Sequence, residues 1–333
     1  MFDESDAEII SGTEEGVFGW VASNYLKSQF AGDGLDTVGL IEMGGASLQV
    51  SFVPKTPVSK SDETKLVPVK IGSKSFKLYT YSFLNYGLEA AQSLFASKLK
   101  ALSPSDSTVD NPCYPVGVEF DGTQGSGVFD QCLKKMDDII DLKMPCPSTC
   151  SFNGVFQPPV SVEKFLAIEN FYYTAEFFNV LSSQDVINDL ENAARSFCSL
   201  KFNDILSKYA TEKDPAEELK KYCFSAAYIS KILRVVTKKS DPSSMFSVTK
   251  YVGNAAIDWA LGSVIFEVVN DARLSPSEWT LSRPSSGGPS LSSWISLEVL
   301  MFLAVVAMLI FFVRYFFRSS IRRSVIPYTR VKS

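Results

Sequence analysis

The strongest constraint on the fold is a pair of adjacent glycines, Gly44 and Gly45, which separate two short runs typical of β-strands. Residues 38–41 are mainly β-branched or apolar, and residues 47–53 alternate between polar and apolar side chains. Glycine has no Cβ, so two in succession let the chain reverse tightly and leave backbone amides open to an anion. We predict a β-hairpin with this turn at its tip.

The second predicted strand places two polar side chains together. Side chains alternate between the faces of a strand, so Ser47 and Gln49 lie on the same face. A hydroxyl and a carboxamide beside open amides are able to hold a water or a phosphate oxygen. Taken alone, the same pattern also fits an ordinary structural turn.

A second segment precedes the hairpin. Ser11 or Thr13 can cap a helix that begins near Glu14, because apolar residues follow at helical spacing. Glu14 and Glu15 then lie in the first turn, where the helix dipole favours a carboxylate. Two interpretations remain: the acids simply stabilise the helix start, or one of them is a general base directed at a water.

In this order the two segments resemble signature boxes of the nucleoside triphosphate diphosphohydrolase (apyrase) family. The first box, Gly-x-(Glu/Asp)-Glu-Gly-x-(Phe/Tyr)-x-Trp, is matched at Gly12, Glu14, Glu15, Gly16, Phe18 and Trp20. The second, Asp-x-Gly-Gly-Ala-Ser-x-Gln, is matched at Gly44, Gly45, Ala46, Ser47 and Gln49. Weaker similarity includes a Tyr-x-x-Ser-Phe-Leu-x-Tyr-Gly pattern at 79–87 and extends to residues 259–262, so the resemblance covers about residues 5–270.

The resemblance implies catalytic roles for residues of both boxes. Glu15 resembles the base that activates the attacking water, and Ser47 the hydroxyl that helps to position it. The amides of Gly44, Gly45, Ala46 and Ser47 resemble the cradle for terminal phosphates.

The resemblance also implies a metal and a nucleobase site. Glu14, Glu42 and Gln49 would surround Ca²⁺ or Mg²⁺ through water molecules, since such ions keep part of their hydration shell. Glu42 departs from the family, which usually has Asp there, and its extra methylene changes the reach of the carboxylate. Tyr228 lies where relatives stack an aromatic ring on the nucleobase; packing within a helix is the alternative.

The resemblance implies an α/β fold with a ribonuclease-H-like lobe of the actin and sugar-kinase type. Two earlier family boxes, a phosphate loop beginning with Asp and an Ala-Gly-Leu-Arg box, do not occur in these 333 residues. We therefore expect an N-terminally shortened form. In it, residues 1–37 are a remnant of a first lobe and hinge, and residues 38–272 are largely the second lobe.

Further elements are expected within that second lobe. Residues 67–71 and 76–79 predict strands, and residues 82–101 predict a helix with one apolar face. The aromatic residues crowded in 165–178 have a helical spacing typical of core. Residues 252–266 predict a closing helix.

Histidine is absent, which excludes Ser-His-Asp catalysis and His-ligated zinc. The six cysteines all fall within residues 113–223, an even number that indicates disulfides more than zinc, which needs Cys-x-x-Cys pairs. Proximity along the chain, in agreement with the family, pairs Cys113 with Cys132, Cys146 with Cys150, and Cys198 with Cys223. Such disulfides indicate an oxidising compartment.

The C-terminal region predicts a membrane anchor. Residues 294–317 are almost wholly apolar and long enough to span a bilayer. They follow a Ser/Pro/Gly-rich linker at 273–293 and precede an arginine-rich tail at 318–333, which predicts a cytoplasmic C-terminus and a lumenal or extracellular body. A net charge of −5 argues against a nucleic-acid partner.

Two functions are consistent with these observations. The first is an apyrase-type hydrolase that removes terminal phosphates from nucleoside tri- or diphosphates by metal-assisted attack of water. The alternative is a catalytically inactive, truncated membrane protein that retains only half of the nucleotide site.

Overall fold

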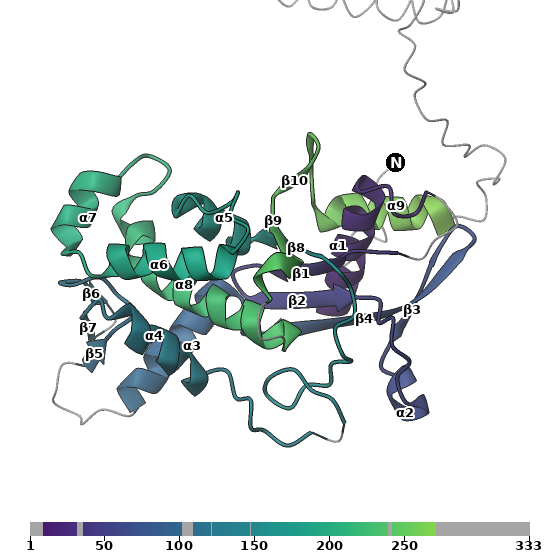
Figure 1. Ribbon diagram of the computed structural model, residues 1–333, viewed down its shortest axis with the longest axis horizontal. Coiled ribbons are helices and arrows are strands. Elements are labelled where there is room, and N and C mark those ends of the chain that lie inside the picture. Colours follow the sequence, from purple (N-terminus) through teal and green to yellow (C-terminus); the bar gives the residue numbers. More distant parts are fainter. Residues whose placement is uncertain are drawn as a thin grey trace, which may run out of the picture. The chain divides into compact units, whose positions relative to one another are not determined.

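The computed structural model describes residues 9–31, 36–101, 109–120, 122–146, 148–238 and 242–270, which belong to one compact unit, Met1–Leu274 (Figure 1). The predicted linker, membrane segment and tail at 273–333 lie outside the described residues. Within the described ranges, no helix combines the length and apolar character needed to cross a membrane.

The centre of this unit is a six-stranded mixed sheet in the order β3-β4-β2-β1-β8-β9. Its strands are β1 (Gly39–Met43), β2 (Ser47–Phe52), β3 (Val67–Ile71), β4 (Lys74–Leu84), β8 (Phe165–Glu169) and β9 (Phe246–Val248). The first four pair antiparallel, whereas β8 runs parallel to β1 and β9 parallel to β8. The predicted hairpin and both further strands are therefore present in an α/β fold.

Two helices cover one face of the sheet. They are α1 (Gly12–Leu26) and α9 (Trp259–Asn270), which also pack against each other (Figure 1). Val17, Trp20 and Val21 of α1 share a buried cluster with Leu40 of β1 and Leu166 of β8. Because strand side chains alternate, the polar residues of β1 and β2 on this face lie beneath α1.

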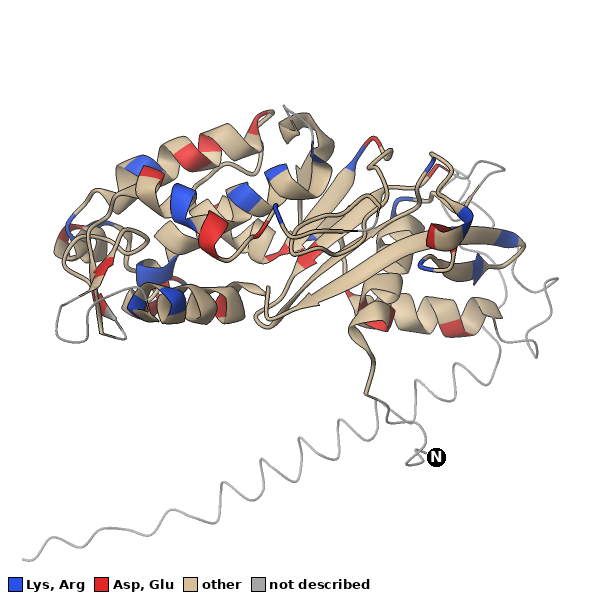
Figure 2. Cartoon of the chain, turned by 90° about the horizontal axis from the view of Figure 1, so that it is seen from below, with Lys and Arg blue, Asp and Glu red and all other residues tan. Residues whose placement is uncertain are grey.

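The other helices pack on the opposite face, where Ile41 and Met43 of β1 enter the larger hydrophobic core. These helices are α3 (Leu88–Ala101), α4 (Phe129–Lys135), α5 (Asn170–Phe177), α6 (Val186–Cys198), α7 (Phe202–Tyr209) and α8 (Ala216–Thr237). Their charged positions lie mainly on the exterior, and the strands carry few (Figure 2). Ion pairs one helical turn apart, such as Lys220 with Glu217 on α8, are part of that exterior.

Smaller elements complete the unit. They are the helix α2 (Lys60–Glu63), the 3₁₀ turns Met136–Asp138 and Ser243–Met245, a three-stranded sheet of β5 (Val109–Asn111), β6 (Glu119–Phe120) and β7 (Thr123–Gly125), and a hairpin of β10 (Tyr251–Val252) and β11 (Ala255–Ala256).

Two predicted boundaries were wrong, and one predicted spacing holds only in part. Strand β4 continues to Leu84, so α3 begins at Leu88 and not at 82; residues 79–84 are held by pairing with β2 on one edge. Residues 165–178 form strand β8 and then α5, with the chain turning at Glu169, where φ is 58°, and Phe165 and Phe171 are buried in the core as predicted. The closing helix α9 begins at Trp259 because a hairpin, turned at Gly253 with φ of 60°, occupies 251–256.

The predicted disulfide pairing is confirmed. Cys113–Cys132, Cys146–Cys150 and Cys198–Cys223 have Cα–Cα separations of 4.8, 6.2 and 5.6 Å. The last of these joins α6 to α8, so it ties together two helices that cover the same face of the sheet.

Candidate active site

The site begins at the start of α1, which Ser11 caps. The Ser11 hydroxyl accepts a hydrogen bond from the Glu14 backbone N–H at 3.2 Å, and the Glu14 carboxylate accepts one from the Ser11 N–H at 2.6 Å. This reciprocal arrangement is a capping box. The hydrogen bonds from Ser11 lower the pKa of Glu14. Glu14 therefore stabilises the N-terminus of α1 in this structure.

Two glycines of α1 allow the helix to lie very close to the sheet. A Cβ on Gly12 would lie 2.3 Å from Oγ of Ser82, and a Cβ on Gly16 would lie 2.3 Å from Oγ1 of Thr80. Any larger residue would push α1 away from β4. The close approach brings Glu15, which lies between these glycines, onto the polar face of β2.

Gln49 connects the two sequence boxes. The residue is 1% exposed, and the two N–H groups of Nε2 are shared among three acceptors, Oε2 of Glu15 at 2.6 Å, Oγ of Ser47 at 2.9 Å and Oγ of Ser82 at 3.1 Å. The structure thus brings together three predicted site residues, Glu15, Ser47 and Gln49. Burial raises the pKa of Glu15, while the N–H from Gln49 is placed to stabilise its ionised form.

The glycine turn between β1 and β2 is tied to the start of α3 through its carbonyls. The carbonyl of Gly44 accepts from Leu88 N–H at 2.9 Å, and that of Gly45 accepts from Glu89 N–H at 3.1 Å. The Gly44 N–H donates to the Ser47 carbonyl at 3.0 Å. This leaves the N–H groups of Gly45 and the following residue, Ala46, without a hydrogen bond to any described residue. Unpaired successive amides are a typical anion-binding feature.

Gly87 completes this turn from the β4–α3 connection. A Cβ there would lie 2.4 Å from the backbone nitrogen of Ser47 and 2.5 Å from that of Ala46. The backbone of residue 87 therefore packs directly on the turn, and no side chain fits between them.

Glu42 lies beneath α1, opposite Gln49 in the β1–β2 register. It is 7% exposed, and its Oε2 has no hydrogen-bond partner in the described part of the chain. A Cβ on Gly19 of α1 would lie 3.0 Å from this oxygen. Burial, with smaller contributions from the negative charges of Glu15, Glu169 and Asp258, raises the pKa of Glu42 to about 8. The carboxyl is therefore mostly neutral at pH 7.

The resemblance implied that Glu14, Glu42 and Gln49 surround a metal ion through water molecules. Among the described ranges, no group of three or more Asp, Glu, His or Cys residues is placed to hold a metal ion. Oε2 of Glu14 accepts from the Ser11 N–H, and Glu42 is buried beneath α1. Oε2 of Glu42 and Oε1 of Gln49 are both buried without a hydrogen-bond partner among the described residues.

Tyr228 does not belong to the Glu15–Ser47–Gln49 cluster. It is on α8, and its side chain lies in the larger hydrophobic core. Its ring is fully buried and stacks on Phe224, with ring centroids 5.5 Å apart and an interplanar angle of 18°. Its hydroxyl donates to the carbonyl of Tyr86 at 2.8 Å. The predicted nucleobase role therefore has no support from the position of the ring.

Two residues of the site were not singled out from the sequence. Ser82 accepts from Gln49 and touches Gly12, and Gly87 packs on the turn. Both belong to the Tyr-x-x-Ser-Phe-Leu-x-Tyr-Gly pattern at 79–87, and that pattern could have identified them as site residues.

Comparison of the sequence with known proteins identifies related proteins. The model of the GDA1/CD39 (nucleoside phosphatase) family matches residues 1–278. Probable apyrase 5 of Arabidopsis thaliana is 31% identical over 292 residues, covering 79% of this chain and 58% of that protein. Ectonucleoside triphosphate diphosphohydrolase 3 of Homo sapiens is 33% identical over 307 residues, covering 79% of this chain and 56% of that protein.

The solved structures agree at the level of the fold. A nucleoside triphosphate hydrolase of Neospora caninum superposes with a TM-score of 0.62 at 16% identity, covering 80% of this chain and 65% of that chain. The chain spans a little over half the length of the two relatives above. Because the family model matches residues 1–278, the chain belongs to the GDA1/CD39 (nucleoside phosphatase) family.

Proposed function

We propose that this chain carries the water-activating part of a phosphohydrolase site that removes the terminal phosphate of nucleoside tri- or diphosphates. The observation that carries this proposal is Gln49, whose amide joins Glu15 of α1 to Ser47 of β2 beside the unpaired amides of Gly45 and Ala46. The substrate class comes from the relatives, which are named as an apyrase and an ectonucleoside triphosphate diphosphohydrolase.

In the proposed reaction Glu15 takes a proton from a water molecule, whose oxygen attacks the terminal phosphorus. A new P–O bond forms to the water oxygen while the bond from phosphorus to the bridging oxygen breaks. The bridging oxygen keeps the electron pair and departs as part of the shortened nucleotide. The raised pKa of Glu15 strengthens it as a base, while the Gln49 N–H orients its carboxylate. Ser47 accepts from Gln49, so its own O–H remains available to the water. The amides of Gly45 and Ala46 would bind oxygens of the phosphate.

We propose Ca²⁺ or Mg²⁺ as the accompanying ion, bound chiefly by substrate phosphates and water. Such an ion neutralises phosphate charge. Within the described ranges, no group of three or more Asp, Glu, His or Cys residues is placed to hold the ion directly.

The test is metal-dependent phosphate release by the full 333-residue chain and by a Glu15→Gln variant. We expect release to fall by about 10²–10⁴-fold in the variant, because the base is lost while the side-chain shape is kept. Thr13→Gln, at an exposed neighbouring position of α1, is the matched control and should keep full activity.

Two outcomes contradict this function. Release that survives Glu15→Gln would remove Glu15 as the base. No release by the unaltered chain, with its disulfides formed, would favour the alternative of a catalytically inactive membrane protein that keeps part of a nucleotide site.

We also propose that this unit is a ribonuclease-H-like lobe attached to a membrane by residues 294–317, with the body lumenal or extracellular. The strand order β4-β2-β1-β8-β9, antiparallel and then parallel, supports the lobe type. The three disulfides support an oxidising compartment. Release of the chain from membranes by alkaline carbonate would contradict the anchor.

A further inference from the structure

The glycine turn is held in place by the connection between β4 and α3, residues 85–87. Asn85 donates its backbone N–H to the carbonyl of Ala46 at 2.9 Å. The backbone of Gly87 packs directly on the nitrogens of Ala46 and Ser47, with no room for a side chain. The position of this connection therefore determines where the amides of the turn lie.

Tyr86, the middle residue of this connection, is bonded to two side chains from distant segments. Its carbonyl accepts a hydrogen bond from the hydroxyl of Tyr228 on α8 at 2.8 Å. Its hydroxyl accepts one from Nδ2 of Asn153 at 2.5 Å, and its ring contacts that of Phe152, with centroids 5.4 Å apart. Because the Tyr86 carbonyl belongs to the peptide group that continues into Gly87, the hydroxyl of Tyr228 fixes the orientation of that peptide group.

Both partners of Tyr86 are themselves held by their surroundings. The ring of Tyr228 is fully buried and stacks on Phe224, so its hydroxyl has one position. Asn153 exchanges two hydrogen bonds with Asp141: Oδ1 accepts from the Asp141 N–H at 2.8 Å, and the Asn153 N–H donates to the Asp141 carbonyl at 2.7 Å. Hydrogen bonds made away from water are strong, so these two donors restrain the connection.

We propose that Tyr228 and Asn153 are positioning residues of the phosphate site. Through Tyr86 they hold the β4–α3 connection against the turn, so that the N–H groups of Gly45 and Ala46 stay directed at one phosphate. Donors that are aimed in advance at an anion bind it without reorganising, and a displacement of about 1 Å weakens them strongly. This role rests on the proposed function, because that function assigns the two amides to a substrate phosphate.

The variant Tyr228→Phe tests the hydroxyl, because it keeps the buried ring and removes only the donor to Tyr86. Calorimetric titration of the full chain uses two nonhydrolysable ligands with Mg²⁺, adenosine 5′-(β,γ-imido)triphosphate and imidodiphosphate, which has no nucleoside. We expect the Kd for both ligands to rise by about tenfold, because both present the same two phosphates to a displaced turn. A residue that only supported the fold would lower the folded fraction and leave the Kd of the folded chain unchanged.

Tyr79→Phe is the matched control. The hydroxyl of Tyr79 also donates to a backbone carbonyl at 2.8 Å, that of Phe156, and the residue is 2% exposed. Neither residue of this bond belongs to the connection at 85–87. The two variants should therefore lose similar stability, but only Tyr228→Phe should weaken binding.

Tyr86→Phe tests the second bond and also serves if Tyr228→Phe does not fold. It removes the acceptor of the Asn153 bond at a half-buried position. We expect the Kd for both ligands to rise by about threefold, because the bond from Tyr228 still holds the connection.

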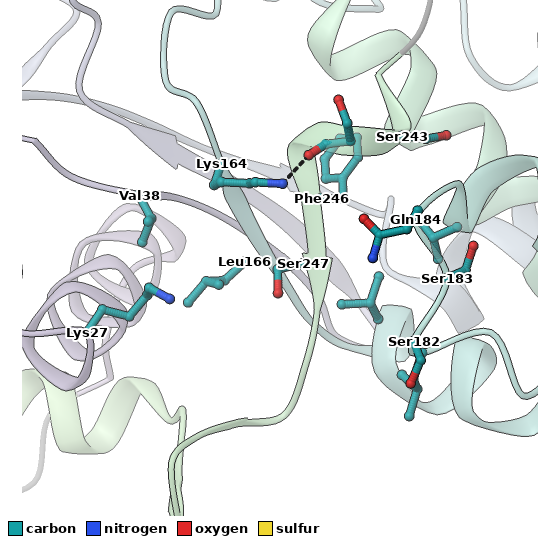
Figure 3. Close-up of a pocket in the computed structure, with 14 residues that line it drawn as sticks. Lys27, Val38, Lys164, Leu166, Ser182, Ser183, Gln184, Ser243, Phe246 and Ser247 are labelled. Carbon is teal, nitrogen blue, oxygen red and sulfur yellow. Dashed lines mark hydrogen bonds between the residues drawn. The ribbon is translucent and has the colours of Figure 1, made fainter.

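A cavity distant from the turn supplies a control for position. This cavity of about 350 Å³ lies beside β9, and Val38, Lys164 and Ser247 are among its lining residues (Figure 3). Val38 precedes β1 and Lys164 precedes β8, whereas the glycine turn follows β1, so the cavity and the turn lie at opposite ends of these parallel strands. Ser247→Ala, at an exposed position there, should leave both Kd values unchanged.

Several results would overturn the positioning role. They are an unchanged Kd in Tyr228→Phe and Tyr86→Phe, or equal weakening in either control. A loss confined to the nucleotide would assign the Tyr228 hydroxyl to the nucleoside and would also overturn it.

Failure of the proposed hydrolysis is a separate result. If the unaltered chain releases no phosphate but Tyr228→Phe still weakens the binding of both ligands, the positioning role is supported and the hydrolysis is contradicted. If the unaltered chain binds neither ligand, both are contradicted.

Discussion

At the scale of single residues, Glu42 shows how burial changes the titration of a carboxyl. Its carboxyl reaches under α1 to the space beside Gly19, where an oxygen is buried without a partner among the described residues. Burial and neighbouring negative charges raise its pKa to about 8 from 4.5. The folded chain therefore holds a proton that the unfolded chain releases between these pH values.

Glu42 makes stability depend on pH. The favourable contribution of the neutral carboxyl is fully present below pH 4.5, and the free energy of unfolding falls as pH rises from there through about 8. Glu42→Gln, which stays neutral, should remove this fall and stabilise the chain at pH 8.5 by about 2–4 kcal/mol. Urea unfolding at pH 5 and pH 8.5 checks this. The exposed Glu267→Gln should leave the pH dependence intact, and identical slopes in both variants would contradict the assignment to Glu42.

At the scale of elements, the contact between α1 and the sheet decides the site. The helix is seated by Gly12 and Gly16 over Ser82 and Thr80, and that closeness is what brings Glu15 within 2.6 Å of Gln49. If larger residues replaced Gly12 and Gly16, α1 would pack farther from the sheet. Glu15 would then lie beyond hydrogen-bond distance of Gln49.

Gly16→Ala tests this contact. The added Cβ would meet Oγ1 of Thr80 at 2.3 Å and Oγ of Ser51 at 2.9 Å, and these hydroxyls are buried and bonded to each other at 2.7 Å. We expect a loss of about 1–3 kcal/mol in the free energy of unfolding, together with reduced phosphate release. Thr13→Ala, exposed on the same helix, should change stability by less than about 0.5 kcal/mol. Equal stability of Gly16→Ala and the unaltered chain would show that α1 is not seated this closely.

At the scale of the whole molecule, disulfides cross-link parts of the chain that pack on the larger core. Cys198–Cys223 ties α6 to α8 across 25 residues of sequence, whereas Cys146–Cys150 closes a loop of 4. Cross-links restrict the unfolded chain more when the closed loop is longer. The two disulfides should therefore differ in their effect on stability.

Paired Cys→Ala substitutions measure that difference. Removing Cys198–Cys223 should lower the free energy of unfolding by about 3 kcal/mol, and removing Cys146–Cys150 should lower it by about half as much or less. Denaturant unfolding of each double variant under non-reducing conditions provides the values. Equal losses would indicate that loop closure is not the source of the stabilisation.

The local sequence determined the features that depend on neighbours along the chain. The hairpin follows from alternation around Gly44-Gly45, and the disulfide pairing from proximity and family resemblance. The sequence offered Ser11 or Thr13 as the cap of a helix beginning near Glu14, and the structure has Ser11 capping α1 at Gly12. The ends of β4 and α9 were less predictable, because pairing with β2 and the hairpin at 251–256 override helical spacing there.

Only the tertiary structure decided which polar groups meet and which are buried. Gln49 reaches Glu15 and Ser82, 34 and 33 residues away, because α1 and β4 both lie against β2. Burial beneath α1 raises the pKa of Glu42, and packing against Phe224 covers the ring of Tyr228. Desolvation and contact depend on three-dimensional neighbours, which the order of residues does not display.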